Sequence, residues 1–207
     1  MNSIVVIPAR GGSKGLKDKN ILDLYGKPLI CYTIDEARKV FSDDRIIFST
    51  DSPKIKQLAE QRGLKVHFIR PEALSTDYST SEDVIRHALN WYNKQHNEIP
   101  DNVVLLQPTS PFRKAKHIKE ALRLFSKKID MLVSVKKTHS NPYFTLFEED
   151  SDEYLFKSKK SSFTRRQDCP EVWEYNGAIY VINTSSIKKN NISKFNKVRK
   201  YVMDDIS

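Results

Sequence analysis

The sequence predicts an α/β fold, in which a mostly parallel sheet carries helices on both faces. From residue 4 to about residue 135, short apolar runs of strand length alternate with segments that have apolar residues at helical spacing. This alternation is typical of βαβ units. The first apolar run also leads directly into a glycine-rich, basic loop, and open α/β sheets bind ligands outside the carboxyl ends of their strands.

The expected elements follow one another along the chain. Strands are expected at residues 4–7, 45–50, 65–69, 103–106, 131–135 and 178–182, and helices at 29–40, 53–62, 81–94 and 116–126. The helix at 53–62 has clear signals at both ends, because Ser52 can cap it, Pro53 fits its first turn and Gly63 can stop it. Right-handed crossovers are expected between the parallel strands.

The alternation breaks at Asn141-Pro142. Two short apolar segments, 143–147 and 154–156, flank an acidic turn at 148–152, and a basic stretch follows at 157–166. We interpret residues 140–170 as an arm inserted within a single domain that spans residues 1–207.

Composition limits the possible environments and partners. Of the 207 residues, 39% are hydrophobic and 29% are charged, and no apolar run approaches the roughly 20 residues that span a bilayer. Cys31 and Cys169 form no disulfide framework, so we expect a reduced, cytoplasmic location and no membrane contact. The net charge of +9 favours an anionic ligand. A nucleic acid is not expected, because the chain lacks a basic helix, zinc-finger spacing and RNA-binding motifs.

The loop at residues 9–20 has the chemistry of a polyphosphate site. Its glycines let main-chain N–H groups converge on an anion, and its basic residues supply charge. The glycines are Gly11, Gly12 and Gly15, and the basic residues are Arg10, Lys14, Lys17 and Lys19. The loop matches neither a Walker A motif nor G-x-G-x-x-G, which disfavours an NTPase and a dinucleotide-linked oxidoreductase. The alternative is a surface loop that is basic without binding a ligand.

A second polar turn follows the strand expected at 103–106. Pro108 and Pro111 restrict the backbone around Gln107, Thr109 and Ser110. A rigid polar turn at the carboxyl end of a strand is suited to contacting a base or a ribose. The alternative is a turn that only caps the following helix.

Seven motifs together resemble the acylneuraminate cytidylyltransferase, or CMP-sialic acid synthetase, family over essentially the whole chain. They are IPARGGSKGLKDKN at 7–20, STD at 49–51, RP at 70–71, TDYSTSED at 76–83, LLQPTSPFR at 105–113, RRQD at 165–168 and NGAIY at 176–180. The first and the fifth are specific, whereas the others would be weak alone. The resemblance implies a Rossmann-like fold and a reaction in which CTP and an acidic nine-carbon sugar give CMP-sugar and pyrophosphate. It also implies a homodimer in which the arm completes the partner's site.

The resemblance further implies a role for individual residues. Arg10 and Lys19 would be catalytic, because they would hold the phosphates where negative charge develops. The implied nucleotide-binding residues are Ala9, Arg10, Gly11, Gly12, Ser13, Lys14, Lys19, Asn20, Arg70 and Ser81. The implied sugar-binding residues are Gln107, Thr109, Ser110, Arg166, Gln167, Asn176 and Gly177.

Two departures from the family pattern leave alternatives open. Asp204 and Asp205 do not fall at the positions of the family's metal-binding aspartates, so Mg²⁺ is expected with the triphosphate but no ligand is assigned. The motif NPYF at 141–144 resembles members that use legionaminic acid. The sugar is therefore a sialic, legionaminic or pseudaminic acid, with a 3-deoxy-octulosonic acid ranked last. A nucleotide-binding protein with impaired catalysis and a basic nucleic-acid-binding protein are the alternatives of other classes.

Overall fold

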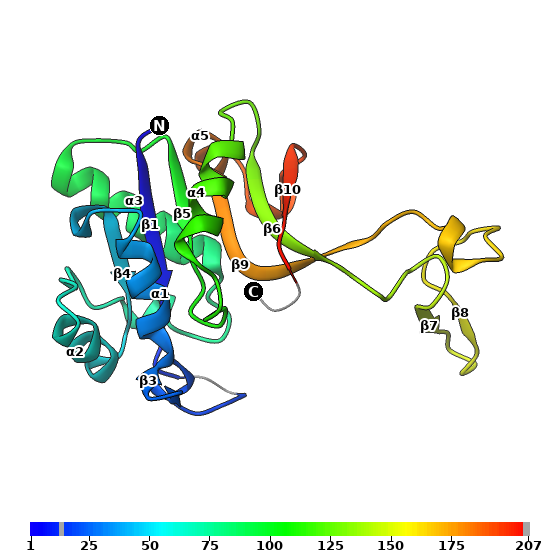
Figure 1. The fold of residues 1–207 in the computed structure, drawn as a ribbon, viewed down its shortest axis with the longest axis horizontal. Coiled ribbons are helices and arrows are strands. Elements are labelled where there is room, and N and C mark those ends of the chain that lie inside the picture. Colours follow the sequence, from blue (N-terminus) through cyan, green and yellow to red (C-terminus); the bar gives the residue numbers. More distant parts are fainter. Residues whose placement is uncertain (13–14, 205–207) are drawn as a thin grey trace.

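The computed structural model describes residues 1–12 and 15–204 and contains a six-stranded sheet with helices on both faces (Figure 1). The strands are β1 (Ser3–Pro8), β2 (Asp23–Leu24), β3 (Lys27–Pro28), β4 (Ile46–Ser49), β5 (Asn102–Leu105), β6 (Met131–Lys137), β7 (Phe147–Glu149), β8 (Leu155–Lys157), β9 (Trp173–Asn183) and β10 (Val198–Val202). The helices are α1 (Leu29–Arg38), α2 (Pro53–Gln61), α3 (Ser81–His96), α4 (Ala115–Leu124) and α5 (Thr184–Lys189). Short 3-10 helices lie at Lys19–Ile21, Asp43–Arg45, Glu72–Leu74, Arg166–Asp168 and Ile192–Lys194.

The main sheet has the strand order β10-β6-β9-β5-β1-β4. β1 pairs in parallel with β4 and β5, and β6 pairs in parallel with β10. Only β9 runs against its two neighbours, β5 and β6. The predicted fold class, a mostly parallel sheet with helices on both faces, is confirmed.

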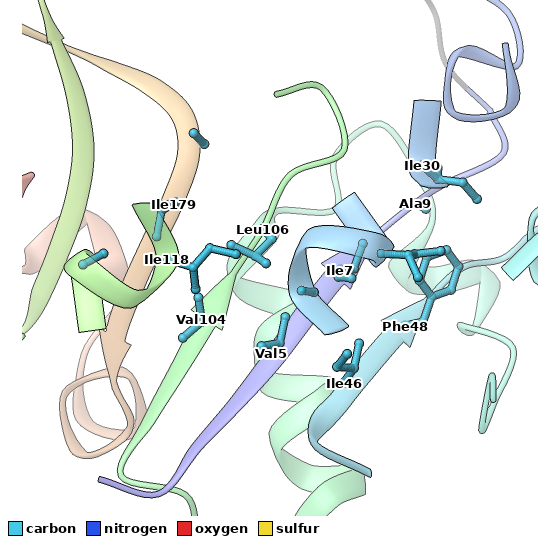
Figure 2. Packing of buried hydrophobic residues seen from close by; sticks show 14 of the residues in the cluster. Val5, Ile7, Ala9, Ile30, Ile46, Phe48, Val104, Leu106, Ile118 and Ile179 are labelled. Atoms are coloured by element: carbon cyan, nitrogen blue, oxygen red, sulfur yellow. The ribbon is translucent and has the colours of Figure 1, made fainter. Parts of the chain in front are cut away.

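Alternating residues of the central strands pack into two separate apolar cores, one on each face of the sheet. Val5 and Ile7 of β1 face α1, α2 and α4, whereas Ile4 and Val6 of the same strand face α3 and α5. Figure 2 shows side chains of the first core, where residues of β1, β4 and the β5 end meet those of the covering helices. Burial on both faces explains why these strands read as continuous apolar runs.

The predicted N-cap of α2 is confirmed, and α3 has a capping box in addition to its predicted apolar pattern. The Ser52 hydroxyl accepts a hydrogen bond from the backbone N–H of Ile55 at 3.4 Å. At α3, Thr80 and Asp83 form a capping box, in which each side chain accepts a hydrogen bond from the other residue's backbone N–H. These two bonds fix the first turn of α3, which borders the cleft described below.

The predicted strand at 65–69 is wrong. This segment forms no strand, although Leu64 and Val66 are buried in the first core. Its apolar alternation reflects packing against the sheet rather than a hydrogen-bonded ladder. At its end, the backbone N–H of Arg70 donates to the carbonyl of Thr50 at 2.7 Å, which draws Arg70 to the carboxyl edge of the sheet.

The arm between β6 and β9 projects away from the sheet (Figure 1). Its hairpin pairs β7 with β8, so the first strand lies later than the predicted segment 143–147. The side chains of Phe147, Tyr154 and Phe156 are exposed there. The assignment of 140–170 as an insertion in one domain spanning 1–207 stays a prediction. Among the described residues, no helix combines the length and apolarity of a membrane span.

Candidate functional site

A cleft of about 370 Å³ opens at the carboxyl ends of β1 and β5, where the sequence predicted a ligand site. It brings together residues from three segments: the glycine-rich loop, the 70–84 segment and the turn after β5. The lining residues are Pro8, Arg10, Lys19, Asn20, Arg70, Asp77, Ser79, Thr80, Ser81, Val84, Gln107, Pro108 and Thr109. Seven of the residues predicted to bind substrate therefore share one cavity: Arg10, Lys19, Asn20, Arg70, Ser81, Gln107 and Thr109.

The described part of the glycine-rich loop is held in place at its two ends. The side-chain amide of Asn20, which is buried, donates to the carbonyl of Arg10 at 2.9 Å. The Arg10 guanidinium donates to the carbonyl of Thr76 at 3.3 Å and to a carboxylate oxygen of Asp77 at 3.0 Å. Arg10 is thereby directed along the wall of the cleft toward the 70–84 segment. The predicted residues Ser13 and Lys14 lie outside the described residues.

Asp51 links the loop to Arg70. One carboxylate oxygen of Asp51 accepts the backbone N–H of Gly11 at 2.8 Å and lies 3.6 Å from the Arg70 guanidinium. The approach of the loop to this turn requires a glycine, since a Cβ at Gly11 would lie 2.9 Å from the Cβ of Ser52. The STD motif at 49–51 thus supports two walls of the cleft, a role that its sequence did not reveal.

Arg70 is a buried cation with unused hydrogen-bonding capacity. Only 4% of the side chain is exposed, and neither Nε nor Nη2 has a hydrogen-bond partner among the described residues. Burial lowers the pKa of Arg70, and the nearby Asp51 carboxylate opposes that shift. A buried guanidinium with free donors at the wall of a cleft is suited to an oxygen-rich ligand.

The opposite wall is formed by the turn after β5. Gln107 and Thr109 line the cleft, whereas Ser110 is buried behind them. Gly177 of β9 lies against Gln107, because a Cβ at Gly177 would be 2.9 Å from the Gln107 Oε1 atom. Gly177 has a φ of +75°, the left-handed region that glycine tolerates best.

Asn176 and Gly177 lie where β9 departs from its regular register with β6. At this register shift, the Ser134 hydroxyl bridges the two strands. It donates to the Asn176 Oδ1 atom at 2.6 Å and accepts the backbone N–H of Ile179 at 2.7 Å. The Asn176 Nδ2 atom is buried with no partner among the described residues. The irregularity displaces Gly177 toward the Gln107 turn, beside the cleft rather than in its lining.

Two predicted sugar-binding residues lie elsewhere. Arg166 and Gln167 are exposed in the short helix at Arg166–Asp168 on the arm, and the Arg166 guanidinium donates to the carbonyl of His139 at 2.9 Å. They do not line the cleft of their own chain. Ala9 is buried at the end of β1, and Gly11 and Gly12 follow it in the loop without lining the cleft.

Besides Pro8 and Pro108, sequence reasoning missed four residues that line the cleft. Asp77, Ser79, Thr80 and Val84 belong to the 76–83 motif or directly follow it, but only Ser81 was singled out there. The available signal was the capping pattern around Thr80, which places these polar residues at the start of α3.

The residues around the cleft do not fit a metal centre held by the protein. No group of three or more His, Cys, Asp or Glu side chains gathers within residues 1–12 and 15–204 in a way that could hold a metal ion. The carboxylates of Asp77 and Asp51 are engaged by Arg10 and Arg70 respectively. Asp205 lies outside the described residues.

Comparisons with known proteins identify the family of this chain. The model of the cytidylyltransferase family matches residues 4–204. The chain is 37% identical to the CMP-N,N'-diacetyllegionaminic acid synthase of Legionella pneumophila, over 92% of this chain and 82% of that protein. The chain therefore belongs to the cytidylyltransferase family.

Two further relatives define the match more closely. The chain is 41% identical to the N-acylneuraminate cytidylyltransferase of Streptococcus agalactiae serotype V, over 88% of this chain and 44% of that protein. It thus spans less than half the length of this relative. The fold superposes on a CMP:2-keto-3-deoxy-manno-octonic acid synthetase complexed with CTP, with a TM-score of 0.69 and 18% identity, over 98% of this chain and 90% of that one.

Proposed function

We propose that this protein joins CTP and an acidic nine-carbon sugar to give CMP-sugar and pyrophosphate. The observation that carries the proposal is the cleft itself, in which Arg10, Lys19 and Arg70 face a polar turn at Gln107. Two of these cations, Arg10 and Lys19, suit a triphosphate, and the neutral polar turn suits a sugar. The names of the relatives, which include an N-acylneuraminate cytidylyltransferase and a legionaminic acid synthase, support the same pair of substrates.

The chemistry follows from this charge distribution. The anomeric hydroxyl of the sugar attacks the α-phosphorus of CTP, the bond to the bridging oxygen breaks, and pyrophosphate departs with the electron pair while the hydroxyl proton is released. Negative charge grows on the phosphate oxygens, so Arg10 and Lys19 act by positioning the phosphates and stabilising that charge. No covalent intermediate with the enzyme is required. Mg²⁺ is expected to enter as the counter-ion of the triphosphate.

Arg70 and Ser81 are proposed to face the cytidine. Arg70 has buried, unpartnered donors, and Ser81 stands in the first turn of α3. Cytosine presents an acceptor at N3 where uracil presents an N–H donor, so a buried Arg70 donor that pairs with the cytosine ring is left unpaired by uracil. We expect higher kcat/KM with CTP than with UTP, ATP or GTP, measured by pyrophosphate release. Equal values for the four nucleotides would contradict this assignment.

The sugar end is proposed to consist of Gln107, Thr109, Ser110, Asn176 and Gly177, with Arg166 and Gln167 supplied by the arm of a second copy in a homodimer. The exposed position of Arg166 on the arm and the exposed side chains of Phe147, Tyr154 and Phe156 support this arrangement. A reducing, cytoplasmic setting remains part of the proposal.

The experiment that tests the function is a panel of acidic sugars incubated with CTP and Mg²⁺. Sialic, legionaminic and pseudaminic acids and a 3-deoxy-octulosonic acid should each be assayed for pyrophosphate and for the CMP-sugar. Turnover with at least one nine-carbon acid is expected. Binding of CTP without turnover on any acid would favour a nucleotide-binding protein with impaired catalysis, and no CTP binding at all would refute the proposal.

A further inference from the structure

Arg113 is the largest of the fully buried side chains, although it carries a charge. It follows the Gln107 turn and precedes α4, and 1% of its surface is exposed. One guanidinium nitrogen, Nη1, donates to the carbonyl of Gln107 at 3.0 Å and to the carbonyl of Ala178 at 2.8 Å. The other, Nη2, donates to the Thr33 hydroxyl at 2.6 Å. Arg113 therefore ties the turn after β5 to β9 and to α1.

The charge of Arg113 is not balanced by an ion pair within the described residues. The nearest acidic influence is Glu36, which raises the pKa of Arg113, whereas burial lowers it to about 10. The Glu36 carboxylate is engaged elsewhere, because it accepts the backbone N–H of Ala115 at 2.6 Å and pairs with Lys39 at 2.5 Å. A packed apolar side chain would fill such a space at lower cost. The guanidinium therefore has a role that an apolar side chain cannot fill, because it donates several hydrogen bonds in a fixed geometry.

Nη1 of Arg113 binds the carbonyls of Gln107 and Ala178, and these residues belong to the two segments that meet where Gly177 contacts Gln107. Ala178 directly follows Gly177, and the Gln107 side chain stands where a Cβ of Gly177 would fall, 2.9 Å from Oε1. Because a single nitrogen bridges both carbonyls, it fixes the separation between the turn and β9. The position of Gln107 in the cleft is thus set from behind by Arg113.

We propose that Arg113 is a positioning residue for the sugar end of the cleft, which controls sugar affinity by fixing the Gln107 turn against β9. It lines no part of the cleft and acts through Gln107. This inference rests on the proposed function, since it takes the Gln107 side to bind the sugar. The nucleotide side, at Gly11 and Arg70, is held by Asp51 instead and should not respond.

The kinetic test uses Arg113→Lys, which keeps the charge but loses the forked geometry. We expect the KM for the sugar to rise about tenfold, the equivalent of one misplaced hydrogen bond, with kcat and the Kd for CTP changed less than about twofold. Thr33→Val removes one of the three acceptors at nearly constant shape and should give a smaller rise of the same kind. Arg123→Lys, at an exposed position of α4, is the matched control and should leave all constants unchanged.

A purely structural role is separated from positioning by two further measurements. In a Gln107→Ala background, Arg113→Lys should no longer raise the sugar KM, because the Gln107 side chain through which it acts on the sugar is removed while the Gln107 carbonyl stays in place. Ile118→Val is the stability control. It shortens a buried side chain of α4 and should lower the stability of the fold while leaving the sugar KM unchanged. Additive effects in the double variant, or an equal rise in KM with Ile118→Val, would overturn the inference.

Amide hydrogen exchange gives a readout that needs no turnover. Arg113→Lys should speed exchange in residues 105–110 and 176–179 while leaving the segment around Gly11 and Arg70 unchanged. Faster exchange throughout the core would indicate general destabilisation and overturn the inference. If the unmodified chain turns over no acidic sugar, the proposed function fails, and exchange alone then decides whether Arg113 fixes the turn.

Discussion

Substitution of Gly177 tests whether its contact with Gln107 contributes to the site. A matched glycine variant separates the effect of backbone strain from that of a side-chain clash. Gly177→Ala places a methyl group 2.9 Å from the Oε1 atom of Gln107, at a residue whose φ is +75°. Gly63→Ala is the matched control. Its φ is +79°, and its new methyl group would meet only the flexible end of Arg38, at 3.5 Å. Gly63 follows α2 and does not line the cleft.

The strain should be similar in the two variants, whereas the effect on the site should differ. A left-handed alanine costs about 1–2 kcal/mol, which corresponds to a fall in Tm of about 2–8 °C in a domain of this size. Only in Gly177→Ala must the Gln107 side chain also move. If Gln107 contacts the sugar, the loss of one neutral hydrogen bond, about 0.5–1.5 kcal/mol, raises the sugar KM about 2- to 10-fold.

The assay combines a thermal melt with sugar KM at saturating CTP. We expect both variants to melt lower by a similar amount, and only Gly177→Ala to bind the sugar more weakly. The effect of Gly177→Ala should also disappear in a Gln107→Ala background. If the two glycine variants share the same sugar KM, the contact between Gly177 and Gln107 has no role in binding, and that reasoning is refuted.

Three further predictions concern the nucleotide wall and the arm. Arg10→Ala and Lys19→Ala should each raise the barrier to turnover by about 2–4 kcal/mol with an unchanged Tm, and near-normal kcat in either would remove the loop from the mechanism. Asp51→Asn keeps an acceptor for Gly11 but removes the counter-charge of buried Arg70, so we expect a loss of about 1–3 kcal/mol in urea denaturation. An unchanged midpoint would show that the pair is not stabilising. Mixing Arg166→Ala with Arg10→Ala chains under subunit exchange should restore part of the activity, whereas a mixture no better than its components, or a chain that sediments as a monomer, would exclude a shared site.

The sequence predicts what is local and misses what depends on distant contacts. The glycine-rich loop and the Gln107 turn both contribute residues to the cleft, and each is a continuous motif at the end of a strand. Arg113 lies within the motif at 105–113. Its contact with Thr33 joins residues 80 positions apart, and no spacing in the sequence indicates such a contact. Asp51 likewise reaches its partners only after the sheet has formed.

Strand direction and pairing were also beyond local reasoning. An apolar run such as that of β9 reads alike in both directions, so its antiparallel course could not be foreseen. The alternation at 65–69 gave a false strand because burial on one side has the same period as a half-buried ladder. Arg166 and Gln167 lie on the arm, within the predicted range 140–170, and their role in the sugar site of a partner stays a prediction.

The antiparallel course of β9 accounts for two features of the molecule at once. Because β9 runs against β5, its first half lies at the carboxyl edge of the sheet, and Gly177 can meet the turn that follows β5. For the same reason, the arm leaves β6 and re-enters β9 at that edge, where the ion pair of Lys137 with Glu171, at 2.7 Å, joins its two stems. Had β9 been parallel, the chain would have needed a crossover to the other edge before it entered β9, and the two stems of the arm could not have met at one edge. The one reversed strand therefore places the proposed sugar end and the root of the arm at the same edge of the sheet.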